Sequence, residues 1–121
     1  MKDQLISFDV AKLAKEKGLD VSSNYFREHE YGDADFDDDF CNWNQYDGYV
    51  TIITQSLLQK FIREKHGIDI LVKRSFSNGE KKYILTPCFD KPRLKGYDNA
   101  EGNTYEEALE IALIIALNMI K

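Results

Sequence analysis

A two-residue turn constrains the middle of this chain more than any other feature. Asn78 and Gly79 stand between two β-prone runs in "IDILVKRSFSNGEKKYILTP". Asn-Gly favours a tight turn whose twist matches that of paired antiparallel strands. Such a turn also fixes the register of the strands, so the sequence predicts a β-hairpin. The expected cross-strand pairs are Ser77 with Glu80, Arg74 with Tyr83, Lys73 with Ile84, and Val72 with Leu85.

The side chains of this hairpin divide into an apolar face and a mixed face, because alternate residues of a strand point to opposite sides. The face expected to cover the core carries Ile70, Val72, Tyr83 and Leu85. The mixed face carries Leu71, Lys73, Lys82 and Ile84. After the hairpin, "RLKGY" at 93–97 is a candidate third strand.

Three other segments have the apolar spacing of amphipathic helices. They begin after Ser7, Thr54 and Thr104, whose side chains can cap a helix. Gly18 and Gly67 are suited to the left-handed turns that would end the first two helices. Just before the second helix, the β-branched run "YVTIIT" is expected to be a strand or an extended entry to that helix.

The order of these elements predicts an α+β fold, in which a small antiparallel hairpin-based sheet of two or three strands packs against two or three helices. The chain has 121 residues, 43% of them hydrophobic, which suits a single globular domain over residues 1–121. Residues 19–48 lack a clear period and are expected to form a long acidic, aromatic-rich loop. So long a loop is unusual in a compact domain, so part of it, such as "NYFREHEY", is expected to have some structure.

The expected loop contains a cluster of aspartates. These are Asp33, Asp35, Asp37, Asp38 and Asp39. A calcium loop of the EF-hand type starting at the first of them would need glycine at its sixth position and glutamate at its twelfth. Asp38 and Asn44 occupy these positions, so we expect a solvated acidic segment without a specific metal site.

Aromatic residues alternate with these acids, and two interpretations are open. The residues are Phe36, Phe40, Trp43, Tyr46 and Tyr49. They would either dock on a basic partner or fold back as a flap over the core with the acids in water. The flap is favoured, because large aromatic side chains seldom stay exposed without a partner.

Charge is segregated along the chain. Residues 1–48 carry 5 basic and 12 acidic side chains, whereas residues 59–95 carry 10 basic and 4 acidic ones. The basic hairpin region 68–95 suggests an alternative function as a nucleic-acid-associated protein. Its candidate contacts are Lys73, Lys81, Lys82, Arg93 and Lys95. The net charge of −5 makes nucleic acid an unlikely partner, and neutralisation of the hairpin by the acidic segments is favoured.

Catalytic and targeting signals are absent from the sequence. There is no GxSxG, P-loop, GxGxxG or HExxH motif, and nothing brings His29 or His66 to a nucleophile. Cys41 and Cys88 are expected to be free thiols. We therefore expect no enzymatic activity and no cofactor. We also expect a cytoplasmic location, because no segment has the apolar length of a membrane span or signal peptide.

Three helical stretches together resemble a family of short uncharacterised proteins from Bacteroides-like gut bacteria and their phages. The stretches are "QLISFDVAKLAKEKGLDV", "TQSLLQKFIREKHGIDI" and "NTYEEALEIALIIALNMI", and they cover a little under half of the chain. The resemblance implies an accessory protein of phage or mobile-element type. It transfers no catalytic or binding residue, because the family has no established activity.

A candidate interaction surface comes from apolar residues at positions expected to be exposed. Ile114 and Leu117 interrupt the polar arc of the last helix, and Leu71 and Ile84 lie on the mixed hairpin face. Two exposed apolar patches favour a partner, either a second copy in a homodimer or an unidentified protein. Alternatively, the first helix or the aromatic flap covers one patch within the chain. The function expected from the sequence is that of a small non-enzymatic accessory or binding protein.

Overall fold

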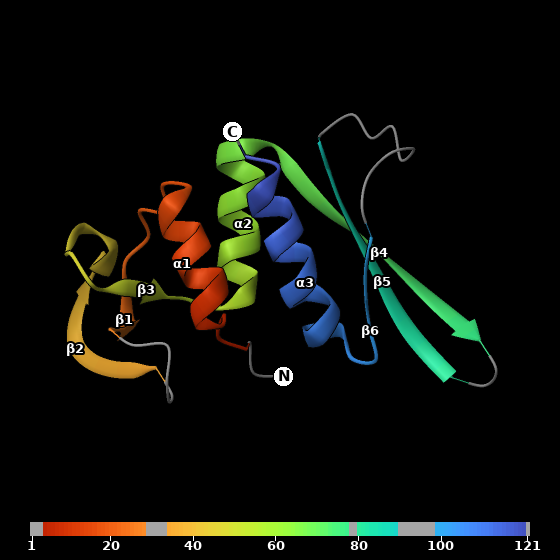
Figure 1. Ribbon diagram of the computed structural model, residues 1–121, viewed down its shortest axis with the longest axis horizontal. Coiled ribbons are helices and arrows are strands. Elements are labelled where there is room, and N and C mark those ends of the chain that lie inside the picture. Colours follow the sequence, from red (N-terminus) through yellow and green to blue (C-terminus); the bar gives the residue numbers. More distant parts are fainter. Residues whose placement is uncertain (1–3, 29–33, 78–79, 90–98, 121) are drawn as a thin grey trace. The chain divides into compact units, whose positions relative to one another are not determined.

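A computed structural model describes residues 4–28, 34–77, 80–89 and 99–120 of the chain (Figure 1). These residues form three α-helices and two three-stranded antiparallel sheets, so the predicted α+β class is confirmed. The chain divides into two compact units, Met1–Gln55 and Ser56–Lys121. The single domain over residues 1–121 stays a prediction.

The first unit starts with the predicted helix, α1 (Phe8–Glu16). The Ser7 hydroxyl accepts a hydrogen bond from the Val10 amide at 3.3 Å, which satisfies one of the free donors of the first turn. Gly18 follows the helix with a φ of 88°, a left-handed conformation that glycine adopts without strain. Both predicted ends of this helix are therefore confirmed.

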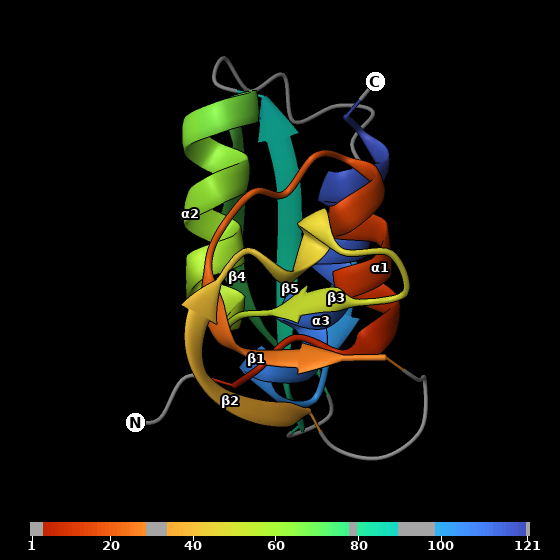
Figure 2. The same ribbon diagram turned by 90° about the vertical axis from the view of Figure 1, so that its left-hand side faces the viewer.

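A sheet occupies the segment that was expected to be a loop. It consists of β1 (Ser23–Arg27), β2 (Asp35–Cys41) and β3 (Val50–Ile52) in the order β2-β1-β3, with a short 3-10 helix, η1 (Trp43–Gln45), before β3 (Figure 2). The prediction of a long loop at 19–48 is wrong for these residues. β2 was not predicted because this edge strand has exposed acids on both faces. It therefore lacks the apolar alternation that is typical of a half-buried strand.

Packing in the first unit joins α1 to β3. Val10, Ala11 and Ala14 form the buried stripe of the helix. The chain before the helix also pairs with the chain after β3, since the Ile6 amide donates to the Ile53 carbonyl at 2.9 Å. The "YVTIIT" run is therefore a strand that continues into a short extended segment.

The second unit contains the predicted hairpin. β4 (Ile68–Ser77) and β5 (Glu80–Phe89) pair antiparallel, and all four predicted cross-strand pairs are observed. A third strand, β6 (Ala100–Gly102), pairs with β5 and gives the order β4-β5-β6. The candidate third strand at 93–97 lies outside the described residues.

Two helices flank this sheet in the sequence. α2 (Gln55–His66) begins directly after Thr54, and Gly67 ends it with a φ of 66°, as predicted. α3 (Tyr105–Asn118) packs against β5 and β6. None of the helices formed by the described residues is long and apolar enough to cross a membrane.

The face of the sheet expected to cover the core is buried only in part. Ile70 and Leu85 are buried as predicted, but Val72 is 50% exposed. Ile70 and Val72 both lie on the edge strand β4, so the burial of this face changes along that strand.

Candidate binding surfaces and cavities

The predicted apolar surface loses one of its four residues. Leu71 on β4 and Ile114 on α3 are exposed, and Ile84 on β5 is half-buried. Leu117, however, is fully buried, so its place in an interaction surface is wrong. It belongs to the buried side of α3. This side consists of Ala108, Leu109, Ala112, Leu113, Ala116 and Leu117.

Sequence reasoning missed the residue that accompanies Ile114. Ile111 is 44% exposed and Ile114 is 36% exposed, and they stand three residues apart on the same side of α3. Glu107 and Asn118 continue this exposed stripe at both ends. The spacing of these four positions could have predicted the exposed side of the helix. However, α3 is apolar almost all round, so its sequence does not show which side is buried.

The aspartates of the sequence cluster lie on β2, apart from Asp33, which is outside the described residues. Tyr25 pairs with Phe36 and Ser23 pairs with Cys41, so the register shifts and 37–40 form a bulge. The Asn24 side-chain amide holds the bulge by donating to the Asp37 carbonyl at 3.0 Å. In the described parts of the chain, no three His, Cys, Asp or Glu side chains gather as metal ligands. The expected lack of a calcium site stays a prediction.

The aromatic residues of this segment divide into two groups. Trp43 stacks on Phe26 of β1 with ring centroids 4.3 Å apart, and Tyr49 packs beside both rings. The predicted flap is therefore confirmed for Trp43 and Tyr49. It is wrong for Phe36 and Phe40, which are 60% and 69% exposed on β2, and Tyr46 lies beside Trp43 and Tyr49 but is itself 48% exposed.

Cys41 lies at the end of β2, and both cysteines are free, as expected. Partial burial, followed by the negative charges of Asp39 and Asp37, raises the pKa of the Cys41 thiol. A raised pKa leaves less thiolate at a given pH, and the thiolate is the reactive form. The two aspartates should therefore slow the alkylation of this thiol.

Asp37→Asn/Asp39→Asn is expected to speed the alkylation of Cys41 by iodoacetamide at pH 8. Removing the two charges lowers the thiol pKa, while asparagine keeps the side-chain oxygen that accepts from the amide of residue 39. Peptide mass spectrometry measures the rate at this cysteine alone. Asp35→Asn is the matched control and should leave the rate unchanged. Equal rates in the double variant and the wild type would contradict the electrostatic effect.

The candidate nucleic-acid contacts are only partly described. Lys73 is exposed on β4, and Lys82 is half-buried on β5. The side chain of Lys81, together with Arg93 and Lys95, lies outside the described part. Two lysines of the mixed face do not make a phosphate-binding surface, so the alternative function gains no support from this geometry.

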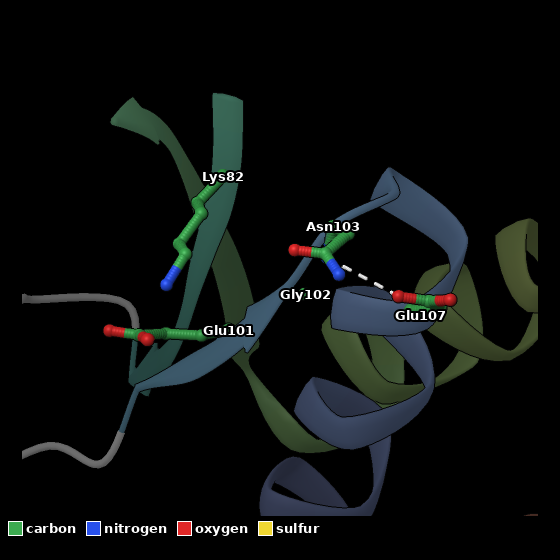
Figure 3. A pocket seen from close by; sticks show the side chains of 5 residues that line it. All are labelled: Lys82, Glu101, Gly102, Asn103 and Glu107. Carbon is green, nitrogen blue, oxygen red and sulfur yellow. Dashed lines mark hydrogen bonds between the residues drawn. The ribbon is translucent and has the colours of Figure 1, made fainter. Parts of the chain in front are cut away.

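A polar cavity of about 300 Å³ lies beside Lys82 in the second unit (Figure 3). Its walls come from β5, β6 and the start of α3. The lining residues are Lys82, Glu101, Gly102, Asn103 and Glu107. The Glu107 carboxylate accepts a hydrogen bond from the backbone amide of Asn103 at 3.3 Å. The backbone amide of Glu107 donates to the Thr104 hydroxyl at 3.1 Å. The Glu107 carboxylate therefore caps the start of α3.

A larger cavity, of about 450 Å³, lies in the first unit between α1 and the start of β3. Its lining residues are Phe8, Lys12, Lys15, Glu16, Gly48, Tyr49 and Val50. The Lys15 ammonium donates to the Tyr49 carbonyl at 2.8 Å and to the Tyr46 carbonyl at 3.2 Å, which fixes one wall. No sequence motif marks this cavity, because its two walls are more than thirty positions apart in the chain.

Comparisons of the chain with models of protein families, with curated proteins and with solved structures find no match.

Proposed function

We propose that this protein is a small non-enzymatic accessory or binding protein and that β2 is its protein-binding strand. The observation that carries the proposal is the exposure of Phe36 and Phe40 on this edge strand. Large aromatic side chains supply much of the binding energy of protein interfaces, and single exposed ones are costly without a partner. The Tyr25 ring packs edge-on against Phe36, with centroids 5.4 Å apart, and widens this apolar spot.

The chemistry of β2 favours one kind of partner. On its outer side, this edge strand presents backbone groups that an added strand can pair with. Asp35, Asp38 and Asp39 are exposed around the two phenylalanines. Opposite charges across an interface attract partners and like charges exclude them. We therefore expect an extended protein segment that combines lysine or arginine with apolar side chains.

Phe36→Ser/Phe40→Ser is expected to weaken the binding of such a segment about tenfold or more, because both apolar anchors are lost. A displayed random peptide library is selected on the wild-type protein, and the affinity of a selected peptide is measured by calorimetry. Tyr46→Ser is the matched control, since it removes an exposed aromatic ring away from β2. Selected peptides that lack basic residues, or that bind the double variant as well as the wild type, would contradict the proposal.

An accessory role of phage or mobile-element type and a cytoplasmic location belong to the same proposal. The resemblance of the three helical stretches supports the first, and the second stays a prediction. A homodimer through the exposed side of α3 stays a prediction. Ile111 and Ile114 are the residues available to it.

A further inference from the structure

The second sheet has an edge strand with the chemistry expected of a partner for β2. Among the described strands β4 pairs with β5 alone, so one long side of β4 faces no other strand. Ile70 of this strand is buried, but the three residues after it are exposed: Leu71, Val72 and Lys73. Arg74 is the next residue in the sequence. Two apolar side chains are therefore followed directly by two basic residues in an extended segment.

The backbone of this segment is also placed for pairing with an added strand. Pro87 lies opposite Ile70 and has no N–H to donate, so this pair fits a non-hydrogen-bonded position of the hairpin. The backbone groups of alternate residues in an antiparallel strand point to the same side. The N–H and C=O groups of Val72 and Arg74 therefore point away from β5, toward the side where an extended segment can bond to them.

The two edge strands carry opposite charges. β2 has four aspartates and no basic residue. β4 has Lys73 and Arg74 against one acidic residue, Asp69. The charge segregation along the chain extends this difference, since residues 1–48 carry mainly acidic charges and residues 59–95 mainly basic ones. Opposite charges speed the approach of two surfaces and favour the matched contact over unmatched ones.

We propose that the partner of β2 is β4 of a second copy of this chain, so that the copies associate head to tail. This inference rests on the proposed function of β2 and names its partner. The two strands belong to separate sheets of one chain, so pairing between them joins two copies. The exposed phenylalanines of β2 contact Leu71 and Val72, and its aspartates lie beside Lys73. Because the two contacting strands differ, each pair of copies leaves one β2 and one β4 free for further copies, which produces a ring or an open chain.

Sedimentation velocity of the full chain over a series of concentrations measures this association. We expect the average mass to rise with protein concentration and to fall when sodium chloride is added, because salt screens exposed charges. Asp38→Lys/Asp39→Lys in β2 and Val72→Ser/Lys73→Glu in β4 are each expected to weaken self-association about tenfold or more. Circular dichroism checks that both variants fold, and the salt dependence of the wild type needs no variant.

Mixing the two variants tests the head-to-tail arrangement itself. The β2 variant keeps an intact β4, and the β4 variant keeps an intact β2. An equimolar mixture should therefore form a complex of two chains with the affinity of the wild type and grow no further. The matched controls are Asp20→Lys/Asp47→Lys and Leu57→Ser/Lys60→Glu, which make the same kinds of change at exposed positions outside both strands. Both controls should associate as the wild type does.

The inference and the proposed function can fail separately. A wild-type mass of one chain at millimolar concentration, while selected peptides still bind β2, would overturn the inference and leave the proposed function in place. Variants that stay single chains when mixed, or a strand variant that associates alone as strongly as the wild type, would also overturn the inference. Association that is unaffected by salt and lost only in Ile114→Glu would place the contact on α3 instead.

Discussion

Leu117→Ala is expected to lower the free energy of unfolding by about 2–5 kcal/mol. Ile114→Ala, one turn earlier in α3, is expected to cost about 1 kcal/mol or less. The first side chain is fully buried, so its removal leaves a cavity as well as losing apolar burial. The second is 36% exposed, so part of its surface already contacts water.

Urea denaturation monitored by circular dichroism measures the free energy of unfolding of both variants. Each variant is the control for the other, because both shorten an aliphatic side chain in the same helix. The slope of the free energy against urea concentration should be the same in both. Equal losses in the two variants would mean that α3 is rotated relative to the buried side described above.

Gly102→Ala is expected to lower the free energy of unfolding by about 1–3 kcal/mol through steric overlap. A Cβ atom at this position would lie 2.7 Å from the Ala108 amide nitrogen and 3.1 Å from the Ala108 Cα. Both atoms are backbone, so neither can rotate away as a flexible side chain would. The lower entropy of the unfolded alanine chain acts in the opposite direction, but by only about 0.4–1 kcal/mol.

Glu101→Ala is the control for this second prediction, since it also introduces alanine into β6 but at an exposed position. It should change the free energy by about 0.5 kcal/mol or less. Thermal denaturation gives the order of the three proteins directly. A Gly102→Ala protein as stable as the wild type would show that β6 and the first turn of α3 are less closely packed than described.

Features governed by local chemistry were predictable from the sequence. The Asn78-Gly79 turn gave the correct register of β4 and β5, because a two-residue turn leaves little choice of pairing. Ser7 and Thr104 gave the correct starts of α1 and α3, because a capping side chain bonds to an amide only three residues away. In each case the deciding contact lies within a few residues.

Features that depend on distant contacts were not predictable. Leu117 looked exposed because α3 has little polar pattern, and only packing decides which side is buried. β2 is acidic on both faces and becomes a strand through its pairing with β1. The cavity beside Phe8 arises from segments that meet only in the folded first unit. The sequence left two interpretations of Phe36 and Phe40 open, docking on a partner or folding back as a flap, and it could not decide between them.

The acidic bulge of β2 also opposes self-association of this protein through pairing of that strand with its own copy. An exposed strand edge normally invites identical chains to stack and grow into fibrils. If two copies joined β2 to β2, the exposed Asp35, Asp38 and Asp39 of each would face like charges on the other. The charges that we propose to attract a basic partner would therefore also oppose pairing of β2 with β2 of a second copy, which should limit aggregation at high protein concentration.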